Sequence, residues 1–113
     1  MATINVYQQF FKGGCTFNGI ERHGVSVLLI SDSDKGTIKY EVAVTFFPHH
    51  TDDDYAVSYD AYLSKTVYEG SGRRSRKREK ELLDALRPVA DQLAAEIGGV
   101  IDWEHPLTSA RTD

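Results

Sequence analysis

The chain has little cysteine and no long apolar run, and each shortage excludes a class of protein. Its single cysteine, Cys15, excludes an internal disulfide framework and a zinc site made only of cysteines. No apolar segment approaches the roughly 20 residues that cross a bilayer, and the polar start is unlike a signal peptide. We therefore expect a cytoplasmic protein with no membrane partner.

The overall composition is that of an ordinary globular domain. Of the 113 residues, 41% are hydrophobic and 27% are charged, which is close to the globular average. The formal net charge of −4 argues against binding nucleic acid or membrane through bulk charge alone. We expect a single domain over residues 1–107 and a flexible tail over residues 108–113.

The first half of the chain has the residue patterns of β-strands. Residues 3–11 are rich in β-branched and aromatic side chains, and Gly13-Gly14 is expected to end that strand. Residues 25–30 are almost continuously apolar, which is typical of a strand buried on both faces. Residues 31–36 have turn chemistry, and residues 38–46 then alternate between apolar and polar. Together these two runs predict a hairpin.

Residues 55–62 predict another strand, which residues 66–68 complete or extend, but Tyr55, Tyr59 and Leu63 also stand at helical spacing. From Ser75 the period becomes helical, with an apolar stripe at Leu82, Leu83, Leu86, Ala90, Leu93, Ala94 and Ile97. Pro88 lies within this stripe, so we expect one long helix kinked there, or two abutting helices. After Gly98-Gly99, residues 100–103 predict a short edge strand. The expected class is α+β, with the helix packed on a mainly antiparallel sheet of four to five strands.

Positive charge is concentrated at the start of the predicted helix. Residues 73–81 carry a net charge of +4, so the rest of the chain carries −8. Cations in a first helical turn oppose the helix macrodipole, whereas arginine offers bidentate geometry to phosphate and carboxylate. We expect a surface that contacts nucleic-acid phosphates or an acidic partner. Its residues are Arg73, Arg74, Arg76, Lys77, Arg78 and Lys80.

The alternative interpretation of this basic segment is a solvated helix face, with Lys77 paired to Glu81. A local sequence resemblance is relevant to the choice between a binding surface and a solvated helix face. Gly70-Ser71-Gly72 leading into Ser75-Arg76-Lys77 resembles the stretch by which double-stranded-RNA-binding domains enter their last helix. That family has small apolar residues where Glu79 and Asp84 stand, and it has a helix before its first strand. The resemblance therefore implies a shared use of a basic helix start, without membership.

An acidic, tyrosine-rich segment offers a second candidate surface. Tyrosine is enriched at protein interfaces, and an acidic strand can imitate nucleic acid toward a basic partner. The alternative function is therefore an inhibitor or adaptor, of the kind found in phages and mobile elements, that binds a basic protein. Its residues are Asp52, Asp53, Asp54, Tyr55, Tyr59, Asp60 and Tyr62.

A metal- or thiol-dependent enzyme is the second alternative. His49-His50 beside the three aspartates is the most metal-like group, but adjacent histidines diverge on extended backbone and the zinc spacings are missing. A pair of Cys15 with His23 is the candidate thiol site. We expect no catalysis, no cofactor and no bound metal. A homodimer through the helix stripe or a strand edge is compatible with all three functions.

Overall fold

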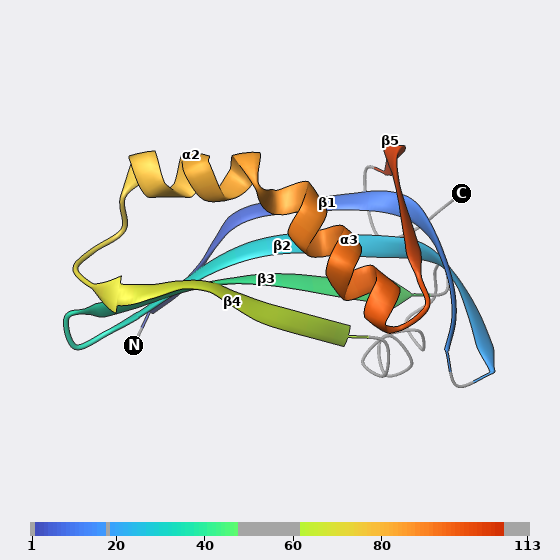
Figure 1. Ribbon diagram of the computed structural model, residues 1–113, viewed down its shortest axis with the longest axis horizontal. Helices are drawn as coiled ribbons and strands as arrows, with labels where there is room; N and C mark the ends of the chain where they lie inside the picture. The colour runs from blue at the N-terminus through green and yellow to red at the C-terminus, as the bar shows by residue number, and fades with distance from the viewer. Residues whose placement is uncertain (1, 18, 48–61, 108–113) are drawn as a thin grey trace.

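Two helices lie on one face of a five-stranded antiparallel sheet in the computed structural model, which describes residues 2–17, 19–47 and 62–107 (Figure 1). The strands are β1 (Ala2–Phe17), β2 (Ile20–Asp34), β3 (Thr37–Phe47), β4 (Tyr62–Ser71) and β5 (Val100–Leu107). The helices are α2 (Arg76–Asp84) and α3 (Leu86–Glu96). The α+β class and the mainly antiparallel sheet are confirmed. Residues 55–61 of the strand predicted over 55–62, and the tail predicted over 108–113, lie outside the described residues.

The sheet order is β4-β3-β2-β1-β5, so the chain leaves the sheet at one edge and returns at the other. Between these edges α2 and α3 cross over one face of the sheet, α2 at the end where β4 finishes and α3 running toward β5 (Figure 1). The loop that leads from β4 into α2 lies beside the turn that joins β2 to β3. No described helix is long and apolar enough to cross a membrane.

The predicted hairpin is formed by β2 and β3. Asp34 pairs with Thr37, which leaves a two-residue turn. Lys35 and Gly36 in that turn have φ angles of 50° and 82°. Positive φ at both central residues defines the type I′ geometry, whose twist matches that of the flanking strands. The turn residues of the sequence therefore predicted this hairpin correctly.

The core lies between the helices and the inner face of the sheet. The alternating residues of β3 supply its centre, each no more than 2% exposed: Ile38, Tyr40, Val42, Val44 and Phe46. Helix α3 covers them with Leu86, Ala90, Leu93 and Ala94. Burying a large apolar side chain of this kind stabilises the fold by about 1.5–3 kcal/mol. On β2, Leu29 is fully buried whereas Leu28 and Ile30 are half-buried, so this strand is not buried equally on both faces.

The prediction that Gly13-Gly14 ends the first strand was wrong. Strand β1 continues to Phe17, with a register shift between Lys12 and Cys15. Gly13 pairs with Ile101 of β5, and a Cβ atom on Gly13 would lie 3.0 Å from the carbonyl oxygen of Val100. The glycine allows close approach of the neighbouring backbone, which is the other use of glycine within a strand.

Of the two alternatives for the helical segment, the single long kinked helix was wrong. The two abutting helices are confirmed, because two short helices meet at Ala85. Pro88 explains the position of the break. It has no N–H to donate to the carbonyl of Asp84, and its ring would clash with that carbonyl in a continuous helix. In the structure Pro88 falls in the first turn of α3, where no intrahelical donor is required. The apolar stripe keeps its phase across the break and packs against the sheet.

Candidate functional site

The basic segment begins in a short loop after β4 and continues into α2. The backbone N–H of Gly72 donates to the carbonyl of Gly36 at 2.9 Å, which fixes this loop to the β2–β3 turn. Ser75 then has extended backbone, and its hydroxyl accepts a hydrogen bond from the N–H of Arg78 at 3.3 Å. Such an N-cap satisfies an amide that the first turn leaves without a helical partner. Ser75 therefore sets where α2 starts and which of the cations fall in its first turns.

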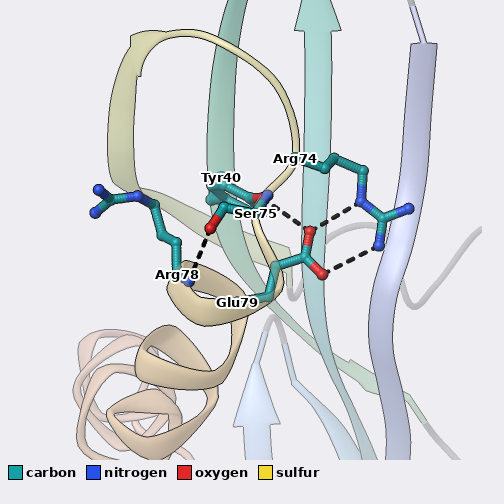
Figure 2. Close-up of polar contacts among 5 residues, drawn as sticks. All are labelled: Tyr40, Arg74, Ser75, Arg78 and Glu79. Carbon is teal, nitrogen blue, oxygen red and sulfur yellow. Dashed lines mark hydrogen bonds and ion pairs between the residues drawn. The ribbon is translucent and has the colours of Figure 1, made fainter.

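Glu79 is buried beneath the start of α2, with only 8% of its surface exposed. Its carboxylate accepts a hydrogen bond from the Tyr40 hydroxyl at 2.8 Å. Arg74 binds the same carboxylate through two bonds, from Nε at 2.8 Å and from Nη2 at 3.1 Å (Figure 2). The Tyr40 hydroxyl in turn accepts from the backbone N–H of Ser75 at 3.4 Å. We refer to Tyr40, Arg74, Ser75 and Glu79 as the Glu79 network.

The electrostatics of this network match its geometry. The hydrogen bonds from Arg74 hold the pKa of Glu79 below its ordinary value of 4.5, against the opposing effect of burial. Burial, and then the hydrogen bond to Glu79, raise the pKa of Tyr40 above its ordinary value of 10.0. At neutral pH Glu79 is therefore ionised and Tyr40 keeps its proton. The charge of Arg74 is balanced inside the molecule.

Arg78 is held by a different contact. Its guanidinium carbon lies 3.9 Å from the centre of the Tyr68 ring, a cation–π geometry. The Tyr68 ring packs in turn near the buried Tyr40 ring, with centroids 6.1 Å apart. In Figure 2 the Arg78 side chain extends away from Glu79, on the opposite side of the helix start from Arg74. Arg74 thus joins the loop to the helix start, and Arg78 joins the helix start to β4.

Arg74 keeps 43% of its side chain exposed despite its contact with Glu79, and the other four cations of the predicted surface are exposed as well. They are Arg73, Arg76, Lys77 and Lys80. Arg73 lies in the loop before α2 and the other three lie on the helix itself. The Lys77–Glu81 pair of the alternative interpretation is not among the ion pairs of the described residues. We call these four residues the basic surface.

The second predicted surface is represented by one described residue. Tyr62 begins β4 and is 43% exposed. The remaining members of that surface lie outside the described residues: Asp52, Asp53, Asp54, Tyr55, Tyr59 and Asp60. The histidine pair His49-His50 lies outside them too. Over the ranges that the structure does describe, no group of three or more His, Cys, Asp or Glu side chains could hold a metal ion.

The candidate thiol is shielded from solvent. Cys15 is 6% exposed and its thiol donates to the carbonyl of Ile97 at 3.7 Å. Burial raises the pKa of the thiol, which keeps it in the less nucleophilic protonated form. His23 is exposed, and its imidazole lies 4.0 Å from the carboxylate of Glu21. These contacts give Cys15 the environment of a structural thiol.

Sequence reasoning located the basic segment but missed the residues that organise it. Tyr40 was assigned to the core face of its strand. Glu79 was treated only as a charge and as a departure from the double-stranded-RNA-binding pattern. Two signals were available: a tyrosine hydroxyl at a core position requires a hydrogen-bond partner, and a glutamate that stands between two cations can pair with a neighbouring arginine. Known protein families, curated proteins and solved structures were compared with the chain, and none matches it.

Proposed function

We propose that the protein is a non-catalytic binding protein whose basic surface contacts the phosphates of nucleic acid. One observation carries this proposal: Arg73, Arg76, Lys77 and Lys80 are exposed together, beside two arginines that the fold itself uses. The rest of the chain has a net negative charge, so a polyanion is attracted to this end of the molecule and repelled elsewhere. We propose the cytoplasm as its location.

The surroundings of the basic surface favour phosphates over an acidic protein partner. Protein interfaces are usually centred on exposed aromatic anchors. Here Tyr40 is fully buried and the face of Tyr68 is covered by Arg78. Cations without an aromatic centre suit a ligand that presents charge at regular intervals, as a phosphate backbone does. Contacts of this kind bind without reading base sequence.

The Glu79 network supports the basic surface from below. It fixes the loop, the helix cap and the first turn of α2 to β3 through hydrogen bonds. Side chains on a fixed backbone lose less conformational entropy on binding than those on a mobile segment. We therefore assign Arg74 and Glu79 a positioning role rather than a direct contact.

Fluorescence anisotropy with labelled nucleic acids tests this function. Duplex RNA, duplex DNA and single strands are titrated with wild type at 50 and 200 mM salt. A variant with Arg73, Arg76, Lys77 and Lys80 changed to alanine is expected to lose most of the affinity. Each phosphate contact removed should lower the slope of log affinity against log salt by about 0.9.

The control changes Lys12 and Lys65, which are exposed on β1 and β4, to alanine and so removes two positive charges from outside the basic surface. This control is expected to bind much as the wild type does. Equal affinity and salt slope for wild type and the four-alanine variant would show that the basic surface is not the site. If the wild type binds no nucleic acid, the search moves to basic protein partners of residues 52–62.

A further inference from the structure

The β2–β3 turn lies against the loop that carries the first residue of the basic surface. The hydrogen bond from Gly72 to Gly36 joins the two segments, and each is one residue from a cation, Arg73 and Lys35. Figure 1 shows the hairpin turn and the start of α2 at the same end of the molecule. Lys35 is exposed. A fifth cation thus borders the basic surface from a different structural element.

Turn geometry alone does not explain a lysine at this position. Lys35 has a φ of 50°, and it is the one non-glycine residue with positive φ in the part of the chain that the structure describes. The first central position of a type I′ turn favours asparagine, aspartate or glycine, which tolerate this conformation better. The turn would therefore form more readily with another residue. What lysine adds at this point is a positive charge on a long, flexible side chain.

We infer that Lys35 is a further phosphate-contacting residue of the basic surface, an inference that rests on the proposed function. The surface then spans two elements, the hairpin turn and the start of α2. A ligand that engages both must present several phosphates along its length, as a nucleic-acid backbone does, rather than a single phosphate group. The carboxylate of Asp34 lies next to Lys35 in sequence, so we expect the contribution of Lys35 to be that of one partly offset contact.

The substitution Lys35→Asn separates charge from turn geometry, because asparagine suits the left-handed conformation. The variant is expected to keep or raise the melting temperature of the wild type. In anisotropy titrations with the nucleic acid that the wild type binds best, its salt slope should fall by up to about 0.9. The factor by which the affinity falls between 50 and 200 mM salt should therefore be up to about threefold smaller for this variant than for wild type.

The control is Lys65→Asn, which removes the same charge from an exposed lysine on β4. Lys65 lies six residues before the end of β4 that faces the turn, about 20 Å along the strand. Weakening by Lys35→Asn but not by Lys65→Asn supports the inference. Equal weakening by both would assign the effect to net charge and overturn it.

The outcomes also distinguish this inference from the proposed function. If Lys35→Asn binds like wild type while the four-alanine variant loses binding, Lys35 makes no contact and the proposed function stands. If the wild type binds none of the nucleic acids, both fail together. A fall in melting temperature for Lys35→Asn would show that the lysine serves the turn, which also overturns the inference.

Discussion

A single buried hydroxyl group connects the sheet to the loop and helix start that carry the basic surface. The Tyr40 hydroxyl donates to Glu79 and accepts from the backbone N–H of Ser75, so both of its hydrogen-bonding roles are filled. Through Ser75 it is linked to the cap of α2, and through Glu79 to Arg74. Buried polar groups are costly unless satisfied, and a satisfied network specifies one arrangement of its members. The position of the basic surface therefore depends on a residue that does not belong to it.

Removing the carboxylate of Glu79 is expected to destabilise the protein and to change how its stability depends on pH. Glu79→Gln leaves Arg74 without its counter-charge, at a cost of about 1–2 kcal/mol at neutral pH, since Arg74 is partly exposed. The folded pKa of Glu79 lies below its unfolded value, so its contribution is complete above about pH 4.5. It is lost as the pH falls through the lower, folded pKa. Urea unfolding between pH 2.5 and 7 measures this.

The wild-type advantage over Glu79→Gln should therefore shrink as the pH falls below 4.5. Glu81→Gln is the control, since Glu81 is an exposed carboxylate on the same helix. A constant difference between wild type and Glu79→Gln over the whole range would contradict the assignment. It would mean that the contact with Arg74 does not stabilise the ionised form of Glu79 in the folded protein.

At this scale the sequence allowed part of the site to be predicted. The cations were found because they are adjacent, and local composition is sufficient to detect such a cluster. The Tyr40–Glu79 contact joins residues 39 apart, so no local pattern could reveal it. The partners of Arg74 and Arg78 lie only five and ten residues away, but their contacts were missed because they depend on how the loop and helix fold back over the sheet. Cations that look alike in the sequence differ in the structure. Whether one contacts another side chain of the protein depends on which face of the loop and helix meets the sheet.

The elements differ in how strongly local sequence determines them. The β2–β3 hairpin was predicted because its turn residues and its alternation act on neighbouring positions. The continuation of β1 through Gly13 depends on β5, which follows some 85 residues later, so local reasoning ended the strand there. Pro88 was recognised as a disruption, but its consequence, a break at Ala85, depends on where the second helix starts. Local sequence patterns predicted an element correctly only where contacts between neighbouring residues determine that element.

Helix α2 is expected to open at lower free energy than α3. Its one buried residue is Glu79, whereas α3 buries Leu86, Ala90, Leu93 and Ala94. Segments with few buried apolar contacts exchange their amide hydrogens through local openings that cost less than global unfolding. Native-state hydrogen exchange should therefore show less protection for the amides of residues 80–84 than for those of residues 90–94.

The same exchange experiment on Tyr40→Phe provides the control for this prediction. Loss of the hydroxyl removes the link from β3 to Glu79 and Ser75, so protection of α2 should fall further while that of α3 changes little. Equal protection of the two helices in the wild type would contradict the expectation. It would show that α2 and α3 open as one unit despite the break at Ala85.

The last strand, β5, completes the sheet and connects it to the second helix. After the helices cross the sheet, β5 adds to the edge formed by β1. Trp103 on β5 packs edge-on against Phe11 of β1, with ring centroids 4.9 Å apart, and its indole N–H donates to Asp91 of α3 at 2.8 Å. The Trp103 side chain thus connects the last strand, on which it lies, to the first strand and to the second helix. The apolar stripe proposed for dimerisation is used within this core, which leaves the strand edges as the candidate dimer contacts.

Because Trp103 joins these elements, we expect its fluorescence to report global unfolding. In urea, the transition of Trp103 fluorescence should coincide with that of far-UV circular dichroism, as a single cooperative domain requires. Leu93→Ala, which creates a cavity beneath the sheet, should move both midpoints together by an amount equivalent to about 2–5 kcal/mol. A fluorescence transition at lower urea than the dichroism transition would show that β5 detaches first. The sheet and helices would then form a core that is stable without the closing strand, and Leu93→Ala would move the two midpoints unequally.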